Sequence, residues 1–184
     1  MSTLTEEQQP RAAEPESKRY IMHTTMLAIC FATICALQPF YALAQSVIVI
    51  RHGEKLDSTP DTVLSPIGEA RAARLANMLA ASNVSTIYTT QFKRTILLAA
   101  PTAKRLGVTP VTVDAKDMDA LIAKIHSRAK DDLVLVVGHS NTVPQILKRL
   151  GHPVVVTVKE EDFDNMFVVT LQPSGTPNVV NLKY

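Results

Sequence analysis

Short apolar runs alternate with amphipathic stretches along most of this chain. The apolar runs are rich in β-branched residues, which is typical of buried strands. They lie at 47–50, 84–90, 108–114, 133–138, 153–158, 166–171 and 178–182. The stretches between them place apolar residues at helical spacing and predict helices. These helices are expected at about 65–81, 94–106, 118–129 and 141–150.

This alternation of strands and helices predicts the class of fold. It is typical of a three-layer α/β/α fold, in which helices cover both faces of a mostly parallel central sheet. Local signals support the boundaries: Pro66 stands where a first helical turn tolerates proline, and Gly107 is a common helix end. Pro110 lies inside the third run, so that strand is expected at an edge of the sheet.

The first 44 residues follow a different pattern. Lys18 and Arg19 precede a short apolar run, Met26–Leu37, and the small-x-small triplet Ala42–Ala44 follows it. These features predict a secretory signal peptide that is cleaved after Ala44. The run is shorter than the roughly 20 residues of a stable membrane span. An uncleaved anchor that holds the protein in the membrane, facing the periplasm, is the alternative.

The predicted signal peptide leads to several expectations about the mature protein. Residues 45–184 should form one domain, periplasmic or secreted, with no stable membrane association after cleavage. Both cysteines, Cys30 and Cys35, lie in the apolar run. The mature chain would therefore have no disulfide, thiol nucleophile or cysteine metal site. The whole chain has a net charge of only +2, with four Tyr, five Phe and no Trp, so a nucleic-acid partner is not expected.

Basic side chains follow three of the predicted strands. Arg51 and His52 come directly after the first strand, Arg94 follows the second, and His139 follows the run at 133–138. Because the carboxyl ends of parallel strands meet at one edge of a sheet, these side chains are expected to converge. Cationic groups in one pocket repel one another unless an anion lies between them. A dianionic phosphate suits two arginine forks and nearby helix N-termini.

Four motifs in order along the chain give a resemblance to a known family. They are "RHGEK" at 51–55, "LSPIGEARA" at 64–72, "IYTTQFKRT" at 87–95 and "VVGHSNTVP" at 136–144. With them, the chain resembles the histidine phosphatase superfamily, also called phosphoglycerate-mutase-like. The resemblance implies a phosphoglycerate-mutase-like fold and covers essentially all of the chain after residue 44.

The resemblance also implies roles for individual residues. His52 would be the nucleophile and would form a phosphohistidine, while Arg51, Arg94 and His139 would bind the phosphate. The two arginines and a protonated His139 would stabilise the charge on the phosphoryl oxygens. Ser140, directly after His139, and Asn141 would add hydrogen bonds.

The proton donor for the leaving group stays open at this point. Glu54, beside the nucleophile, is the nearest candidate for a general acid; the alternatives are Asp114, Asp117 and Asp119. The short segment between Arg94 and His139 leaves no room for the inserted lid from which many relatives supply the acid. No spacing of metal ligands such as H-E-x-x-H occurs, so neither a metal nor another cofactor is expected.

These inferences favour a phosphatase that acts on a small phosphorylated substrate, a phosphomonoester, through a phosphohistidine on His52. A phosphohistidine or phosphoprotein phosphatase is one alternative, although export of the chain argues against it. A non-catalytic phosphate-binding module is the other, and a pure binder would not need a nucleophile at His52. The oligomeric state stays open.

Overall fold

The computed structural model describes residues 44–128, 131–173 and 175–184. The predicted signal peptide, with Cys30 and Cys35, lies outside the described residues except for its last residue, Ala44. Within the described ranges, no helix is long and apolar enough to cross a membrane.

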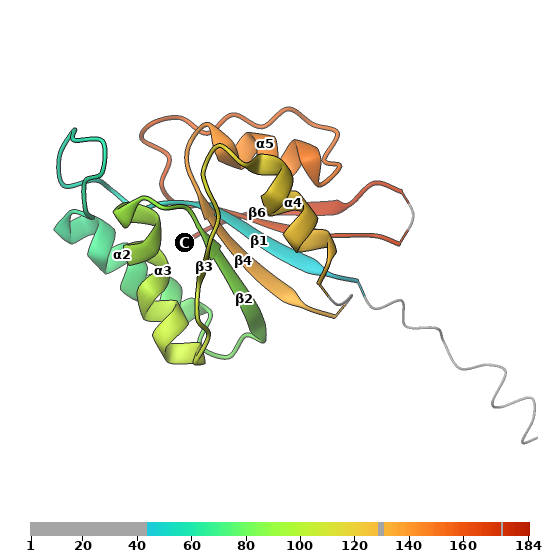
Figure 1. Ribbon diagram of the computed structural model, residues 1–184, viewed down its shortest axis with the longest axis horizontal. Helices are drawn as coiled ribbons and strands as arrows, with labels where there is room; N and C mark the ends of the chain where they lie inside the picture. Colours follow the sequence, from blue (N-terminus) through green and yellow to red (C-terminus); the bar gives the residue numbers. More distant parts are fainter. Residues whose placement is uncertain (1–43, 129–130, 174) are drawn as a thin grey trace, which may run out of the picture. The chain divides into compact units, whose positions relative to one another are not determined.

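A six-stranded mixed sheet forms the centre of the fold (Figure 1). Its strands are β1 (Ser46–Arg51), β2 (Val84–Thr89), β3 (Val111–Thr112), β4 (Leu133–Gly138), β5 (Asn165–Thr170) and β6 (Asn178–Lys183). Their order is β3-β2-β4-β1-β5-β6. The first four in this order pair in parallel, whereas β5 pairs antiparallel with β1 and β6 antiparallel with β5.

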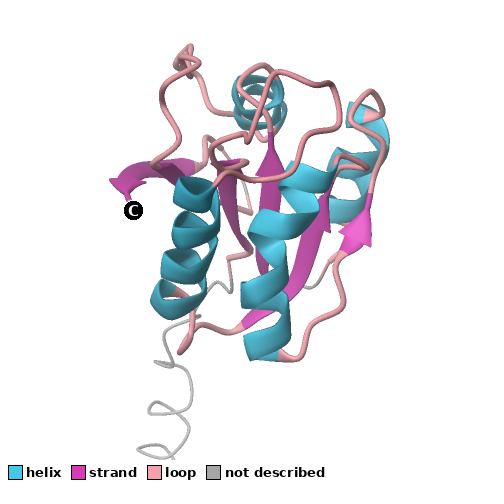
Figure 2. Cartoon of the chain, turned by 90° about the vertical axis from the view of Figure 1, so that its left-hand side faces the viewer, coloured by secondary structure: helices cyan, strands magenta, loops and turns pink. Residues whose placement is uncertain are grey.

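Helices cover both faces of the sheet. They are α2 (Pro66–Met78), α3 (Lys93–Leu106), α4 (Met118–His126) and α5 (Thr142–Arg149). Helices α2 and α3 pack against each other, and Figure 2 shows them lying across one face of the sheet. Helices α4 and α5 lie on the opposite face (Figure 1). This arrangement confirms the predicted three-layer α/β/α fold.

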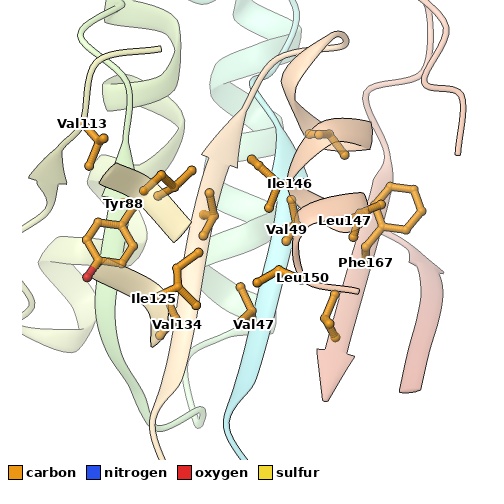
Figure 3. Packing of buried hydrophobic residues seen from close by; sticks show 14 of the residues in the cluster. Val47, Val49, Tyr88, Val113, Ile125, Val134, Ile146, Leu147, Leu150 and Phe167 are labelled. Atoms are coloured by element: carbon orange, nitrogen blue, oxygen red, sulfur yellow. The ribbon is translucent and has the colours of Figure 1, made fainter. Parts of the chain in front are cut away.

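The alternating side chains of the central strands give each face its own hydrophobic core. On one face, Ile146 and Leu147 of α5 lie close to Val47 and Val49 of β1 (Figure 3), and all four side chains are fully buried. Residues of the other parity, such as Ile50, pack with α2 and α3 on the opposite face. Burial on both faces explains why the first run and the run at 133–138 are continuously apolar rather than alternating.

Most predicted elements are confirmed within a few residues. Ser65 caps α2 by accepting a hydrogen bond from the Gly68 amide, Gly107 ends α3 at a φ of 68°, and β3 is an edge strand. The predicted strand at 153–158 is wrong: this segment forms no strand, and Val154 and Val155 are exposed. The place beside β1 is taken by β5, which leaves the valine run without a partner.

The turn after β1 lies against the first turn of α2 at Gly68. A Cβ at Gly68 would lie 2.5 Å from the carbonyl oxygen of Glu54, and this oxygen already accepts a hydrogen bond from the Ser65 amide at 2.9 Å. The segment that carries His52 is thus held by a contact that only glycine permits.

Gly68→Ala should therefore destabilise the fold. The added methyl group has to push the backbone away and strain the Glu54–Ser65 bond, so we expect a loss of about 1–3 kcal/mol in the free energy of unfolding. Urea denaturation measures it, with Ile67→Ala as the control because that side chain is exposed. An unchanged unfolding midpoint for Gly68→Ala would contradict the importance of this contact.

Candidate active site

The basic side chains predicted from the sequence lie together at the carboxyl ends of three neighbouring strands. Arg51 ends β1 in register with Gly138, the end of β4, and the His52 amide donates to the Gly138 carbonyl at 2.9 Å. Arg94 is the second residue of α3, which follows β2. The rings of His52 and His139 have their centroids 5.2 Å apart. The parallel pairing of β1, β4 and β2 produces this convergence.

His52 is buried, and its hydrogen bond defines which ring nitrogen is free. Its Nδ1 lies 2.7 Å from the carbonyl oxygen of Gly53. A carbonyl oxygen can only accept, so Nδ1 carries the proton and Nε2 keeps its lone pair. Burial, with help from the charges of Arg51 and Arg94, lowers the pKa of His52 to about 3. The imidazole is therefore neutral at pH 7, the form that a nucleophile needs.

His139 has partners at both ring nitrogens. Arg94 donates from Nη2 to Nδ1 at 3.3 Å, so the proton resides on Nε2, which lies 3.0 Å from the hydroxyl oxygen of Thr90. Burial, together with Arg94 and Arg51, lowers the pKa of His139 to about 4. His139 is therefore neutral at pH 7 in the free protein, and its protonation beside a bound phosphate stays a prediction. A bound phosphate dianion would raise the pKa of His139 and so oppose the effect of Arg94 and Arg51.

The guanidinium of Arg94 is oriented by contacts on three sides. It donates to the Pro60 carbonyl at 2.8 Å and to His139, and its Cζ lies 4.4 Å from the centre of the Phe92 ring. Among the described residues, its Nε has no hydrogen-bond partner although the atom is buried. Burial of the side chain lowers the pKa of Arg94.

Arg51 is almost fully buried, with 2% of its side chain exposed. Its Nη1 donates to the carbonyls of Lys159 and Glu160 at 2.7 and 2.8 Å, and its Cζ lies 4.1 Å from the centre of the Phe163 ring. Its Nε has no partner within the described part of the chain. The segment before β5 therefore fixes the position of this arginine.

Glu160 also lies in the site, although no pattern in the sequence predicted it there. Its carboxylate accepts from Arg51 Nη2 at 2.8 Å and from the Ser140 hydroxyl at 2.6 Å, while 75% of its side chain is exposed. The hydrogen bond from Ser140, followed by the charge of Arg51, lowers the pKa of Glu160. In the sequence, a glutamate after an apolar run reads as a solvated charge, and no motif marks it.

Glu54 does not suit the predicted role of general acid. Both of its carboxylate oxygens are bound by Arg71, with the shortest distance 2.6 Å from Nη2. These hydrogen bonds lower the pKa of Glu54, so it is ionised at neutral pH and neutralised by its partner. Because this ion pair ties the turn after β1 to α2, the carboxylate has a structural role here.

The three aspartates named as alternatives also lie away from the chemistry. Asp114 accepts from the Lys116 amide, Asp117 caps α4, and Asp119 pairs with Arg149. None of them lines the cleft that holds His52.

An open cleft of about 360 Å³ joins these groups. Its lining contains all four basic residues predicted from the sequence, together with Ser140, Asn141 and Glu160, and the lysines Lys55 and Lys116. Within residues 44–128, 131–173 and 175–184, no cluster of three His, Cys, Asp or Glu side chains could hold a metal ion. Because its lining is rich in basic side chains, the cleft is suited to an anion.

Comparison with known proteins finds a family match over part of the chain and solved structures with a similar fold. The family model of the histidine phosphatase superfamily (branch 1) matches residues 47–116. Solved structures share the fold at low sequence identity. The protein histidine phosphatase SixA, solved with tungstate, has a TM-score of 0.61 and 18% identity over 75% of this chain and 96% of that chain.

Two further structures give similar values. A phosphoserine phosphatase from Entamoeba histolytica, solved with 3-phosphoglyceric acid, has a TM-score of 0.59 and 14% identity over 76% of this chain and 97% of that chain. A mycobacterial glucosyl-3-phosphoglycerate phosphatase has a TM-score of 0.57 and 14% identity, with coverages of 77% and 98%. A search of curated proteins gives no match. The chain is therefore similar to the histidine phosphatase superfamily over residues 47–116, and it shares the fold of these solved structures.

Proposed function

We propose that this protein is a phosphatase that hydrolyses phosphomonoesters through a phosphohistidine on His52. One observation carries the proposal: the Gly53 carbonyl holds the Nδ1 proton of His52, so an unprotonated Nε2 is available in a cleft shared with Arg51 and Arg94. Neutral imidazole can attack phosphorus without a base to deprotonate it. Covalent capture then divides one difficult hydrolysis into two easier steps.

The two arginines suit the charge that the reaction develops. A phosphoryl group in transfer spreads negative charge over its oxygens, and fixed donors that meet this charge lower the barrier. Arg51 and Arg94 both line the cleft that holds His52, so an anion bound there would meet two cations. This arrangement supports an anionic substrate.

A phosphohistidine or phosphoprotein substrate is supported by a different observation. The described residues between β2 and β4 form only α3, β3 and α4, without a lid, so the cleft stays open. A protein surface could approach such a site, and one structural relative is named a protein histidine phosphatase.

Turnover separates an enzyme from a phosphate-binding module. Purified residues 45–184 should release 4-nitrophenol from 4-nitrophenyl phosphate. Rapid quenching in alkali with a ³²P-labelled ester should trap label on the protein, and acid should release it, as expected for a phosphoramidate. Binding of phosphate without any turnover would refute the enzymatic proposal.

Activity should be independent of added metal. Because the described part of the chain contains no cluster of metal ligands, a chelator such as EDTA should leave kcat/KM unchanged. Vanadate, which can adopt the five-coordinate geometry of phosphorus in transfer, should inhibit competitively. Initial rates with and without each reagent measure both effects. Strict dependence on a divalent ion would disprove this expectation.

A further inference from the structure

A proton donor is needed if the leaving group is an alkoxide. Aryl oxides of low pKa can leave unprotonated, but an alkyl oxygen needs a proton as the P–O bond breaks. Glu160 is the only carboxylate that lines the cleft within the described residues. Glu54, which Arg71 binds, and the three aspartates do not line this cleft.

We propose that Glu160 is the general acid and base of this reaction, an inference that rests on the proposed phosphatase function. Its carboxylate bridges Arg51 Nη2 and the hydroxyl of Ser140, the residue directly after His139. It is therefore held beside two of the residues that would bind the phosphate. Its side chain is 75% exposed, so it can exchange protons with solvent and move by rotation about its own bonds.

Substrate binding would change the protonation of this carboxylate. The hydrogen bonds from Ser140 and Arg51 hold the pKa of Glu160 below its usual range. A phosphate dianion competes for both donors, and its own negative charge favours the neutral acid. The loss of the two hydrogen-bond donors raises the pKa of Glu160, and so does the added negative charge of the phosphate. The same substrate that needs a proton thus prepares Glu160 to carry one.

Glu160 takes part in both steps. In the first, the lone pair of His52 Nε2 forms the N–P bond while the ester P–O bond breaks and its electron pair goes to the leaving oxygen. That oxygen takes the proton of the Glu160 acid and leaves as an alcohol. In the second, a water oxygen bonds to phosphorus, the N–P pair returns to Nε2, and the Glu160 carboxylate accepts one water proton. Inorganic phosphate leaves and the acid is restored.

Leaving-group dependence tests this role against a merely structural one. Glu160→Gln keeps the size of the side chain and an oxygen that can accept from Arg51, but it cannot donate an acid proton. We expect kcat/KM for glycerol 2-phosphate to fall on the order of 10²-fold, while that for 4-nitrophenyl phosphate changes by no more than a few-fold. Glu161→Gln is the matched control, because this neighbouring carboxylate is also exposed and lies outside the cleft lining.

The other outcomes overturn the proposal in distinguishable ways. Equal losses for both esters mean that Glu160 only positions Arg51. A wild-type protein that hydrolyses the nitrophenyl ester but not the alkyl ester has no acid at all, and the phosphatase function stands without this role. Absence of wild-type turnover on both esters overturns the proposed function and this inference with it.

Discussion

Replacing His52 by alanine should reduce turnover of 4-nitrophenyl phosphate on the order of 10⁴-fold or more, the scale seen when a covalent nucleophile is removed. No other described imidazole can replace it, because His139, its neighbour in the cleft, has Nδ1 bound by Arg94 and Nε2 bound to Thr90. The variant should also fail to trap a phosphoryl group on the protein. Initial rates and ³²P trapping measure both losses.

The fold should survive this substitution, since the imidazole lies at the end of β1 rather than among the two hydrophobic cores. Unfolding by urea checks that point. His126→Ala is the matched control, because this histidine is exposed and lies outside the cleft. Near-normal turnover by His52→Ala would reject the phosphohistidine mechanism.

Arg94→Ala should lower kcat/KM by roughly 10²- to 10³-fold, about 3–4 kcal/mol of transition-state stabilisation. The substitution removes a fixed cation from the cleft and also the donor that keeps His139 Nδ1 unprotonated. Inhibition by vanadate should weaken in parallel, because vanadate uses the same contacts as the phosphoryl group in transfer. Steady-state rates and vanadate inhibition constants measure the two effects.

Arg94→Lys distinguishes charge from geometry. Lysine restores the charge but not the planar fork, so only part of the activity should return. Arg105→Ala, in the exposed last turn of the same helix, is the control for effects on α3 itself. Full activity in Arg94→Ala would show that Arg51 alone is enough to bind the phosphate and stabilise its charge.

The periodic pattern of apolar residues was sufficient to predict that the basic side chains converge. It was not sufficient to predict which of them carry a proton. Continuous apolar runs before Arg51 and after Asp132 indicated strands buried on both faces, and parallel pairing then places the residues at their carboxyl ends together. The charge of His139 depends instead on how deeply its ring is buried and on which nitrogen faces Arg94. Neither quantity has a sequence signature.

Two errors share one cause. The segment at 153–158 has strand-like composition, but composition does not determine whether a neighbouring strand is available, and β5 takes the place beside β1. The same mistake concealed Glu160, which follows that segment and reaches Arg51 only because the chain forms a loop there.

The error over Glu54 has a different cause. Glu54 was preferred for its closeness to His52 in sequence, whereas its partner Arg71 lies 17 residues away.

The two halves of the site differ in how freely they can be changed during evolution or by design. His52, Arg94 and His139 depend on the paired ends of β1, β2 and β4, where an insertion would disturb the sheet. Glu160 lies on the connection from α5 to β5. This connection forms no strand in the described structure and pairs with none. The exposed part of such a connection tolerates changes of composition. New substrate preferences could therefore be selected by randomising the exposed residues 153–155, while Lys159 and Glu160, which hold Arg51, and the phosphate-binding groups are left intact.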